Sequence, residues 1–158
     1  MAHLNYYLDL CVDTYVVNKN AVLLRLHEKY NYWGAVGGHI DPGEDANEAA
    51  LREVWEEAGL TVTLIGPAGW TKTDTETNKD LVPPLFVNRH TINTSHSHSA
   101  FIFAAKSETR DINPQTKEDV GVECKWVTKT ELDELLKTDN RLHPDVHRYA
   151  SAALQLVQ

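Results

Sequence analysis

The segment GHIDPGEDANEAALREVWEEAGL, residues 38–60, decides the fold and gathers most of the acidic side chains of the chain. Only one cation, Arg52, opposes its seven carboxylates, which are Asp41, Glu44, Asp45, Glu48, Glu53, Glu56 and Glu57. Most of the net charge of −8 therefore lies in this segment, and the rest of the chain is nearly neutral. The position of this charge tells more about function than its total does.

A helix is predicted inside the segment. Asp45 followed by Glu48 is the pattern of a capping box, and Gly59 suits the residue that ends a helix. The apolar residues between them recur at helical spacing, at Ala46, Ala49, Ala50, Val54 and Ala58. In such a helix Glu53, Glu56 and Glu57 share one face, because residues three and four apart are neighbours.

Three carboxylates on one helix face repel one another unless a cation lies among them. Oxygen-rich sites with several carboxylates suit hard cations such as Mg²⁺ or Mn²⁺. A solvated acidic helix face is the alternative interpretation, and the helix alone does not decide between the two.

The residues around the helix complete a longer pattern. Gly38 is followed after five residues by Glu44, after seven more by Arg52-Glu53, and then by Glu56-Glu57, Gly59 and an apolar residue. This pattern resembles the Nudix box, the signature of the Nudix hydrolases, and every specified position is filled. The resemblance implies an α+β fold, an α/β/α sandwich around a mixed β-sheet, as a single domain over residues 1–158. It also implies hydrolysis of a pyrophosphate bond.

The resemblance assigns roles to individual residues. Glu53, Glu56 and Glu57 would bind Mg²⁺, or Mn²⁺, with help from the Gly38 carbonyl. Arg52 would orient a glutamate through a forked ion pair, and Glu57 and Glu53 would serve catalysis. The remaining residues implied in support of the loops are Gly37, Glu44 and Gly59. Many family members have Pro where Val36 stands here, and this position is structural.

The base that activates water is expected to be Glu53, with Glu118 as the second choice. Glu118 and Asp119 lie in the polar segment 108–119, which could close over a bound diphosphate. A solvated loop is the alternative interpretation of that segment.

Further elements are predicted on both sides of the segment. We expect a loop over residues 27–32 and an irregular crossing over residues 34–43. A surface loop is expected over residues 69–80. Thr128 and Pro144 are expected to begin two more helices. Strands are predicted over residues 8–17, 21–26, 60–66, 85–91, 99–105 and 123–127.

Length and composition restrict the class of protein. A chain of 158 residues suits one domain, and 42% hydrophobic residues suffice for a core. No apolar run approaches a membrane span, no secretory pattern is visible, and two cysteines make no disulfide framework. We therefore expect a cytoplasmic protein that binds neither a membrane nor a nucleic-acid polymer. The oligomeric state, including a homodimer, stays open.

Several residues outside the acidic segment are candidates for ligand contact. His90, His96 and His98 suggest a second metal site, phosphate ligands or a solvated loop, and no cysteine at fixed spacing supports zinc. We expect His96, His98 and Trp33 to lie at the rim of the substrate site. The residues expected in the core are Trp55, Trp126 and the two cysteines, Cys11 and Cys124.

The leading function is hydrolysis of a nucleoside diphosphate linked to another group, of nucleotide, ADP-ribose or dinucleotide type. The alternative is a non-catalytic Nudix sensor that binds ADP-ribose or a dinucleotide, which the complete glutamate set disfavours. The isoprenoid isomerase and nucleotide-sugar branches of the family fit less well, because the first needs a catalytic cysteine and the second has an altered box. The sequence does not identify the substrate, since loops outside the metal helix set specificity.

Overall fold

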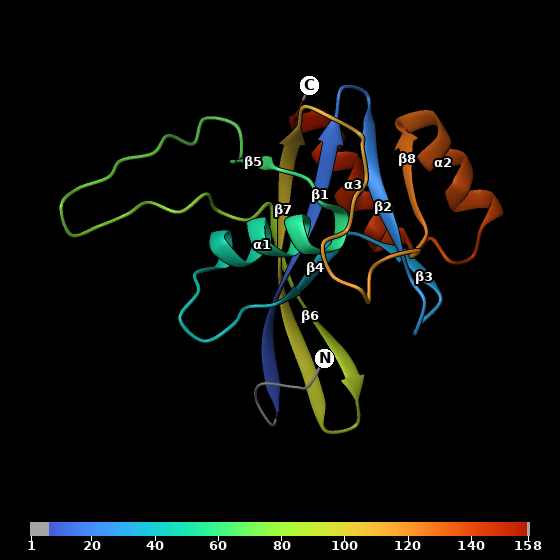
Figure 1. The fold of residues 1–158 in the computed structure, drawn as a ribbon, viewed down its shortest axis with the longest axis horizontal. Helices are drawn as coiled ribbons and strands as arrows, with labels where there is room; N and C mark the ends of the chain where they lie inside the picture. Colours follow the sequence, from blue (N-terminus) through green and yellow to red (C-terminus); the bar gives the residue numbers. More distant parts are fainter. Residues whose placement is uncertain (1–6, 158) are drawn as a thin grey trace.

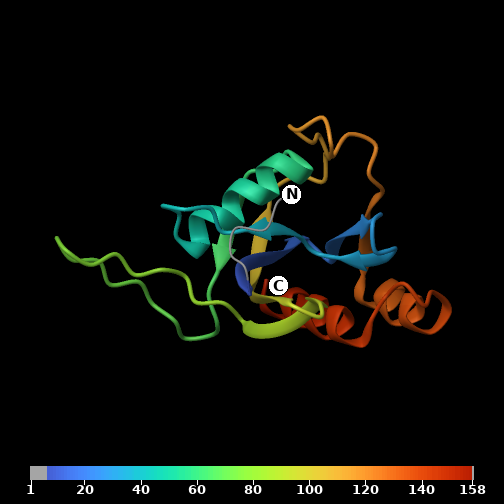
Figure 2. The same cartoon turned by 90° about the horizontal axis from the view of Figure 1, so that it is seen from below.

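The computed structural model describes residues 7–157, which form an eight-stranded mixed sheet with helices on both faces (Figures 1 and 2). The elements in chain order are β1 (Leu8–Asn18), β2 (Ala21–His27), β3 (Tyr32–Gly34), β4 (Val36–His39), α1 (Ala46–Ala58), β5 (Val62–Ile65), β6 (Phe86–Asn93), β7 (His96–Ser107), β8 (Cys124–Thr128), α2 (Lys129–Thr138) and α3 (Pro144–Leu156). The predicted α+β class is confirmed.

Strands β1 and β7 form the centre of the sheet. They pair in parallel along most of their length, whereas every other pair of strands is antiparallel. The strand order is β3-β2-β1-β7-β5, and β4, β6 and β8 pair with β1, β7 and β2 respectively. The first and seventh strands therefore bring together segments that lie about 90 residues apart in the chain.

Helix α1 begins and ends as the sequence predicts. The Asp45 side chain accepts hydrogen bonds from the backbone N–H groups of Asn47 and Glu48. In return, the Glu48 side chain accepts a hydrogen bond from the Asp45 N–H. Gly59 has a φ of 68° and donates to Trp55 O. A Cβ at Gly59 would lie 1.8 Å from the carbonyl oxygen of Asn113, so only glycine fits.

The two faces of the sheet bury different helices. Val16 and Val54 belong to the core between the sheet and α1, and Tyr15 and Tyr149 to the core between the sheet and α3. Figure 2 shows α1 and α3 on opposite sides of the sheet. This separation matters for the site, because successive residues of β1 point alternately to the two helices.

Two of the tryptophans expected in the core lie closer to solvent. Trp55 is 51% exposed, because the face of α1 that packs on the sheet carries Glu53, Val54 and Ala58, and Trp55 is not part of that face. Trp126 is half-buried beside the α1 core, and its Nε1 donates to Arg110 O at 3.1 Å. The expectation is wrong for Trp55 and partly met for Trp126.

Two short strands, β3 and β4, were not predicted, and they lie in the stretch expected to be irregular. Strand β4 contains both Gly37 and Gly38, which are poor strand formers. It lies so close to β1 that a Cβ at Gly37 would be 2.0 Å from the Val12 carbonyl oxygen. Tertiary packing, and not local preference, makes this segment a strand.

None of the helices within residues 7–157 has the length and apolar character that a membrane crossing requires. The cytoplasmic location stays a prediction from the sequence, and the sequence makes no choice of oligomeric state.

Candidate active site

The three glutamates of α1 differ in their surroundings. The Glu53 side chain is almost completely buried, Glu57 is mostly buried, and Glu56 is partly exposed. Gly38 of β4 lies directly against Glu53, since a Cβ at that position would be 2.3 Å from Glu53 Oε1. The backbone of β4 and one face of α1 therefore form a common acidic surface.

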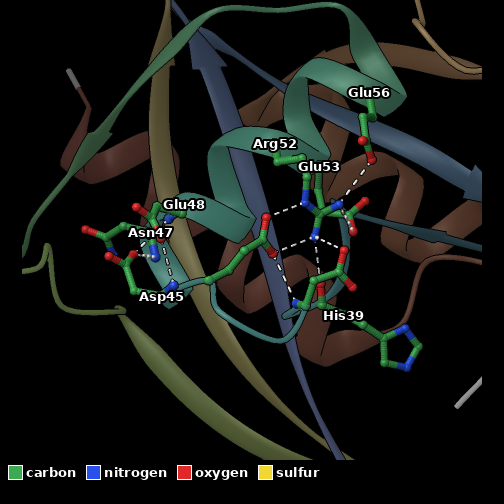
Figure 3. A network of polar contacts seen from close by, with 9 residues as sticks. His39, Asp45, Asn47, Glu48, Arg52, Glu53 and Glu56 are labelled. Carbon is green, nitrogen blue, oxygen red and sulfur yellow. Dashed lines mark hydrogen bonds and ion pairs between the residues drawn. The ribbon is translucent and has the colours of Figure 1, made fainter. Parts of the chain in front are cut away.

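Arg52 holds the acidic surface together through all three of its guanidinium nitrogens (Figure 3). Its Nε and Nη2 donate to the two carboxylate oxygens of Glu44 at 2.6 and 3.0 Å, which is the forked pair expected from the sequence. Its Nη1 donates to Glu53 at 2.8 Å and to Glu56 at 3.1 Å. Its Nη2 also donates to the carbonyl oxygen of His39 at 2.9 Å. Arg52 thus fixes the box loop and two of the helix glutamates at once.

Glu57 has a separate set of partners on β4 and β2. Its Oε2 accepts from the Gly37 N–H at 3.0 Å, and its Oε1 lies 3.4 Å from Arg25 Nη1. Arg25 also forms an ion pair with Asp119. No local pattern marks Arg25 as a site residue, because its place beside Glu57 follows from the packing of α1 on the sheet.

The loop carboxylate that reaches the site is Asp119. Its side chain is mostly buried against Arg25, whereas Glu118 is exposed. The choice of Glu118 as second candidate for the base is corrected accordingly. The bend at residues 116–121 turns these two neighbours in different directions, which the polar sequence of the loop does not reveal.

Burial raises the pKa values of two of the helix glutamates. Removal from water raises the pKa of Glu57 from 4.5 to about 8, although Arg25 and the Gly37 N–H act in the opposite direction. Burial likewise raises the pKa of Glu53, against the opposing effect of Arg52. Carboxylates held in such surroundings favour either a proton or a cation.

The arrangement fits a hard divalent cation. Its candidate ligands are all oxygens, from Glu53, Glu56 and Glu57 and from the carbonyl of Gly38, as Mg²⁺ and Mn²⁺ prefer. Only a residue without a side chain leaves room at Gly38 for the Glu53 carboxylate.

A cavity of about 460 Å³ lies on the α3 face of the sheet. Asp13 lines this cavity and also lies 3.0 Å from the Cβ position of Gly37, whose N–H binds Glu57. The cavity and the acidic surface thus lie on opposite faces of the sheet, and Gly37 of β4 contacts residues of both. Its aromatic lining consists of Tyr15, Tyr30, Tyr32, Tyr149, His90 and His143.

The structure corrects the expected rim of the substrate site. Trp33 is 0% exposed, and its Nε1 donates to Asp139 at 3.1 Å, so its ring is closed to a ligand. His96 is buried within the sheet, and His98 lies beside it, whereas His90 lines the cavity. His90 and His98 are paired across β6 and β7 and lie on the same face, so position along the strands, and not the face, decides which histidine reaches the cavity.

Comparison with known proteins settles the family. The model of the NUDIX domain family matches residues 8–149, which is most of the chain. The chain belongs to the Nudix hydrolase family. A crystal structure of a NUDIX-family hydrolase from Clostridium perfringens is similar to this Nudix hydrolase over 98% of this chain and 100% of the other, with a TM-score of 0.79 and 30% identity.

Two curated Nudix relatives share parts of the sequence. A putative 8-oxo-dGTP diphosphatase of Bacillus subtilis is 40% identical over 55 residues, 34% of this chain and 37% of that protein. An RNA pyrophosphohydrolase of Roseobacter denitrificans is 29% identical over 104 residues, 65% of this chain and 63% of that protein. The chain thus spans less than two thirds of either relative.

The raised pKa of Glu57 makes the stability of this Nudix domain depend on pH. Between pH 4.5 and about 8 the folded state holds a proton that the unfolded state has lost. The free energy of unfolding of metal-free protein should therefore fall as pH rises through this window, by up to about 1.4 kcal/mol per pH unit for one proton. Because Mg²⁺ competes with that proton, its stabilising effect should grow with pH.

Thermal unfolding in EDTA and in Mg²⁺, followed across that pH window, measures both effects. The Glu57→Gln variant is the control, since it carries no proton to displace. A rise of the thermal midpoint with Mg²⁺ that is the same at every pH would contradict the assignment of Glu57.

Proposed function

We propose that the chain hydrolyses a pyrophosphate bond in a nucleoside diphosphate linked to another group, in a reaction that requires Mg²⁺ or Mn²⁺. The observation that carries the proposal is the acidic surface of α1 and β4, which Gly37 links to a cavity lined with tyrosines on the other face of the sheet. The first feature suits cations that bind phosphates, and the second suits a nucleoside. The names of the two curated relatives, a diphosphatase and a pyrophosphohydrolase, agree with this reaction class.

The metal ions would be held by Glu53, Glu56 and Glu57 with the Gly38 carbonyl. When bound, such ions neutralise phosphate charge and lower the pKa of a coordinated water. Arg52 keeps Glu53 and Glu56 in place, and Arg25 does the same for Glu57 and Asp119. The protein thereby fixes its charged groups before a substrate arrives, which reduces the cost of reorganisation during the reaction.

Glu53 is proposed as the base that accepts the proton of the attacking water. Burial raises the pKa of Glu53, so its carboxylate is a stronger proton acceptor than an exposed glutamate. Asp119 is the second candidate, because it is the carboxylate of the 108–119 loop that faces the site.

The nucleoside is proposed to lie in the cavity between the sheet and α3. Tyr30, which is 53% exposed, offers a ring on which a base can stack, and Asp13, Asn88 and Asp145 offer polar groups for its edge. Asn88 already donates to the Tyr149 hydroxyl at 3.3 Å, which holds both side chains at the wall of the cavity. A small nucleotide derivative fits this volume better than a polymer does.

A substrate panel tests the proposal. Phosphate and pyrophosphate release with Mg²⁺ would be measured for nucleoside triphosphates, ADP-ribose, nucleotide sugars, dinucleoside polyphosphates and an RNA with a 5′-triphosphate. We expect turnover of at least one small nucleotide and little turnover of the RNA. Calorimetric binding of ADP-ribose or a dinucleotide without turnover of any compound would instead support the sensor function.

A further inference from the structure

We propose a second metal-ion site, separate from the glutamates of α1, where Asp9, His96 and His98 meet Cys11 and His39. The site would hold one first-row transition-metal ion such as Zn²⁺. It lies on the face of the sheet that carries α3, because Cys11 packs in the same core as Tyr15 and Tyr149. This proposal does not depend on the proposed hydrolysis.

Strand registers bring the five side chains together. Asp9 of β1 is paired with His98 of β7, and Cys11 of β1 is paired with His39 of β4. Asp9 and Cys11 point to the same face because they are two residues apart, and so do His96 and His98. Three strands from distant parts of the sequence therefore contribute to one cluster.

The distances within the cluster suit a shared ion. One ligand atom each of Asp9, His96 and His98 lies within 4.8 Å of the other two, and the same holds for Cys11, His39 and His98. Asp9 Oδ2 is 3.2 Å from His39 Nε2 and 3.3 Å from His96 Nε2. Ligands bound to zinc at about 2.0–2.3 Å in a tetrahedron lie roughly 3.3–3.8 Å apart. Small side-chain shifts would therefore convert either triad into a metal site.

The imidazole rings pack in T-shaped, edge-to-face pairs and do not stack. The His39 and His98 rings lie 5.0 Å apart at 74°, and the His96 and His98 rings 5.1 Å apart at 89°. Rings at such angles can direct nitrogen atoms toward one point. His98 belongs to both triads, which makes it the central residue of the proposed site.

Burial and charge also favour an ion. Asp9 is 0% exposed, and Cys11, His39 and His96 are buried as well. A buried carboxylate is costly unless a positive charge or several hydrogen bonds compensate it. A network of hydrogen bonds between protonated histidines and Asp9 is the competing explanation, and only a binding measurement separates the two.

The set of ligands indicates the kind of ion. Imidazole nitrogens with a thiolate and one carboxylate suit Zn²⁺, Co²⁺ or Ni²⁺, whereas Mg²⁺ prefers oxygens. The two sites would thus select different metals. They share only β4, where the His39 carbonyl accepts from Arg52 while its ring points away from Arg52 (Figure 3).

Cobalt substitution tests the site without relying on activity. The full chain would be stripped of metal, saturated with Mg²⁺ and titrated with Co²⁺, and the visible absorption of tetrahedral cobalt would be recorded. We expect one Co²⁺ per chain in the parent, and an affinity lowered more than about 100-fold in His98→Asn, because loss of a ligand should exceed the effect of losing an outer-shell partner.

His147→Asn is the matched control, since His147 lies on α3, away from the cluster, beside Asp133. It should bind Co²⁺ as the parent does. His98→Gln provides a second variant if His98→Asn fails to fold, as judged by circular dichroism, because His98 belongs to both triads. Absence of tetrahedral cobalt bands in the folded parent, or parental affinity in a folded His98 variant, would overturn the proposal in favour of a hydrogen-bonded network.

Discussion

Glu57→Gln and Glu53→Gln are each expected to lower the turnover number by at least about 100-fold while the fold is retained. Loss of a partner beyond the metal ligands costs about 10–100-fold, and loss of a ligand should cost more. Each change keeps the shape of the side chain and removes one negative charge. The measurement is steady-state hydrolysis of the best substrate of the panel, with circular dichroism as a check of folding.

Glu118→Gln is the matched control for these two variants, because Glu118 is an exposed carboxylate near the site. Its turnover should equal that of the parent. Near-normal turnover in both Glu57→Gln and Glu53→Gln would show that the α1 glutamates do not carry the reaction. Loss of activity in Glu118→Gln alone would move the base to the 108–119 loop. Since Glu53 has two proposed roles, its pH–rate profile is needed to separate metal binding from proton transfer.

Arg52→Lys is expected to lower turnover by about 10–100-fold and to raise the Mg²⁺ concentration needed for half-maximal rate. Lysine keeps the charge but cannot make the forked pair with Glu44 while also reaching Glu53 and Glu56. Titration of the rate with Mg²⁺ at saturating substrate measures both quantities. The helix glutamates should stay in place but lose their common orientation.

Arg141→Lys is the control for the loss of a forked arginine pair. Arg141 holds Asp139 through Nε at 2.9 Å and Nη2 at 2.7 Å, away from the α1 glutamates. This variant should change neither turnover nor the Mg²⁺ requirement. If Arg52→Lys behaves in the same way, Arg52 has no positioning role.

The sequence predicts α1 and its glutamates well because their signals are local. A capping box, a glycine stop and a 3.6-residue period all lie within the same 15 residues, and the face shared by Glu53, Glu56 and Glu57 follows from them. The pair between Arg52 and Glu44 also lies inside the Nudix box.

Residues that depend on strand pairing could not be found in this way. Arg25 of β2 reaches Glu57 only because α1 packs on the sheet, and its sequence context is that of an ordinary strand. The parallel register of β1 and β7 places Asp9 opposite His98, and no local pattern encodes that register. Trp33 resembled a ligand-stacking residue, but contacts with Asp139 and Lys125 from later segments bury it.

Turnover in the presence of a chelator, followed by addition of defined metals, tests the central claim most directly. The claim is that the α1 glutamates hold Mg²⁺ or Mn²⁺ for hydrolysis of a pyrophosphate bond. Excess EDTA should abolish hydrolysis of the preferred nucleotide, and Mg²⁺ or Mn²⁺ in excess over the chelator should restore it in the parent but not in Glu57→Gln. Undiminished turnover in excess EDTA would contradict the claim.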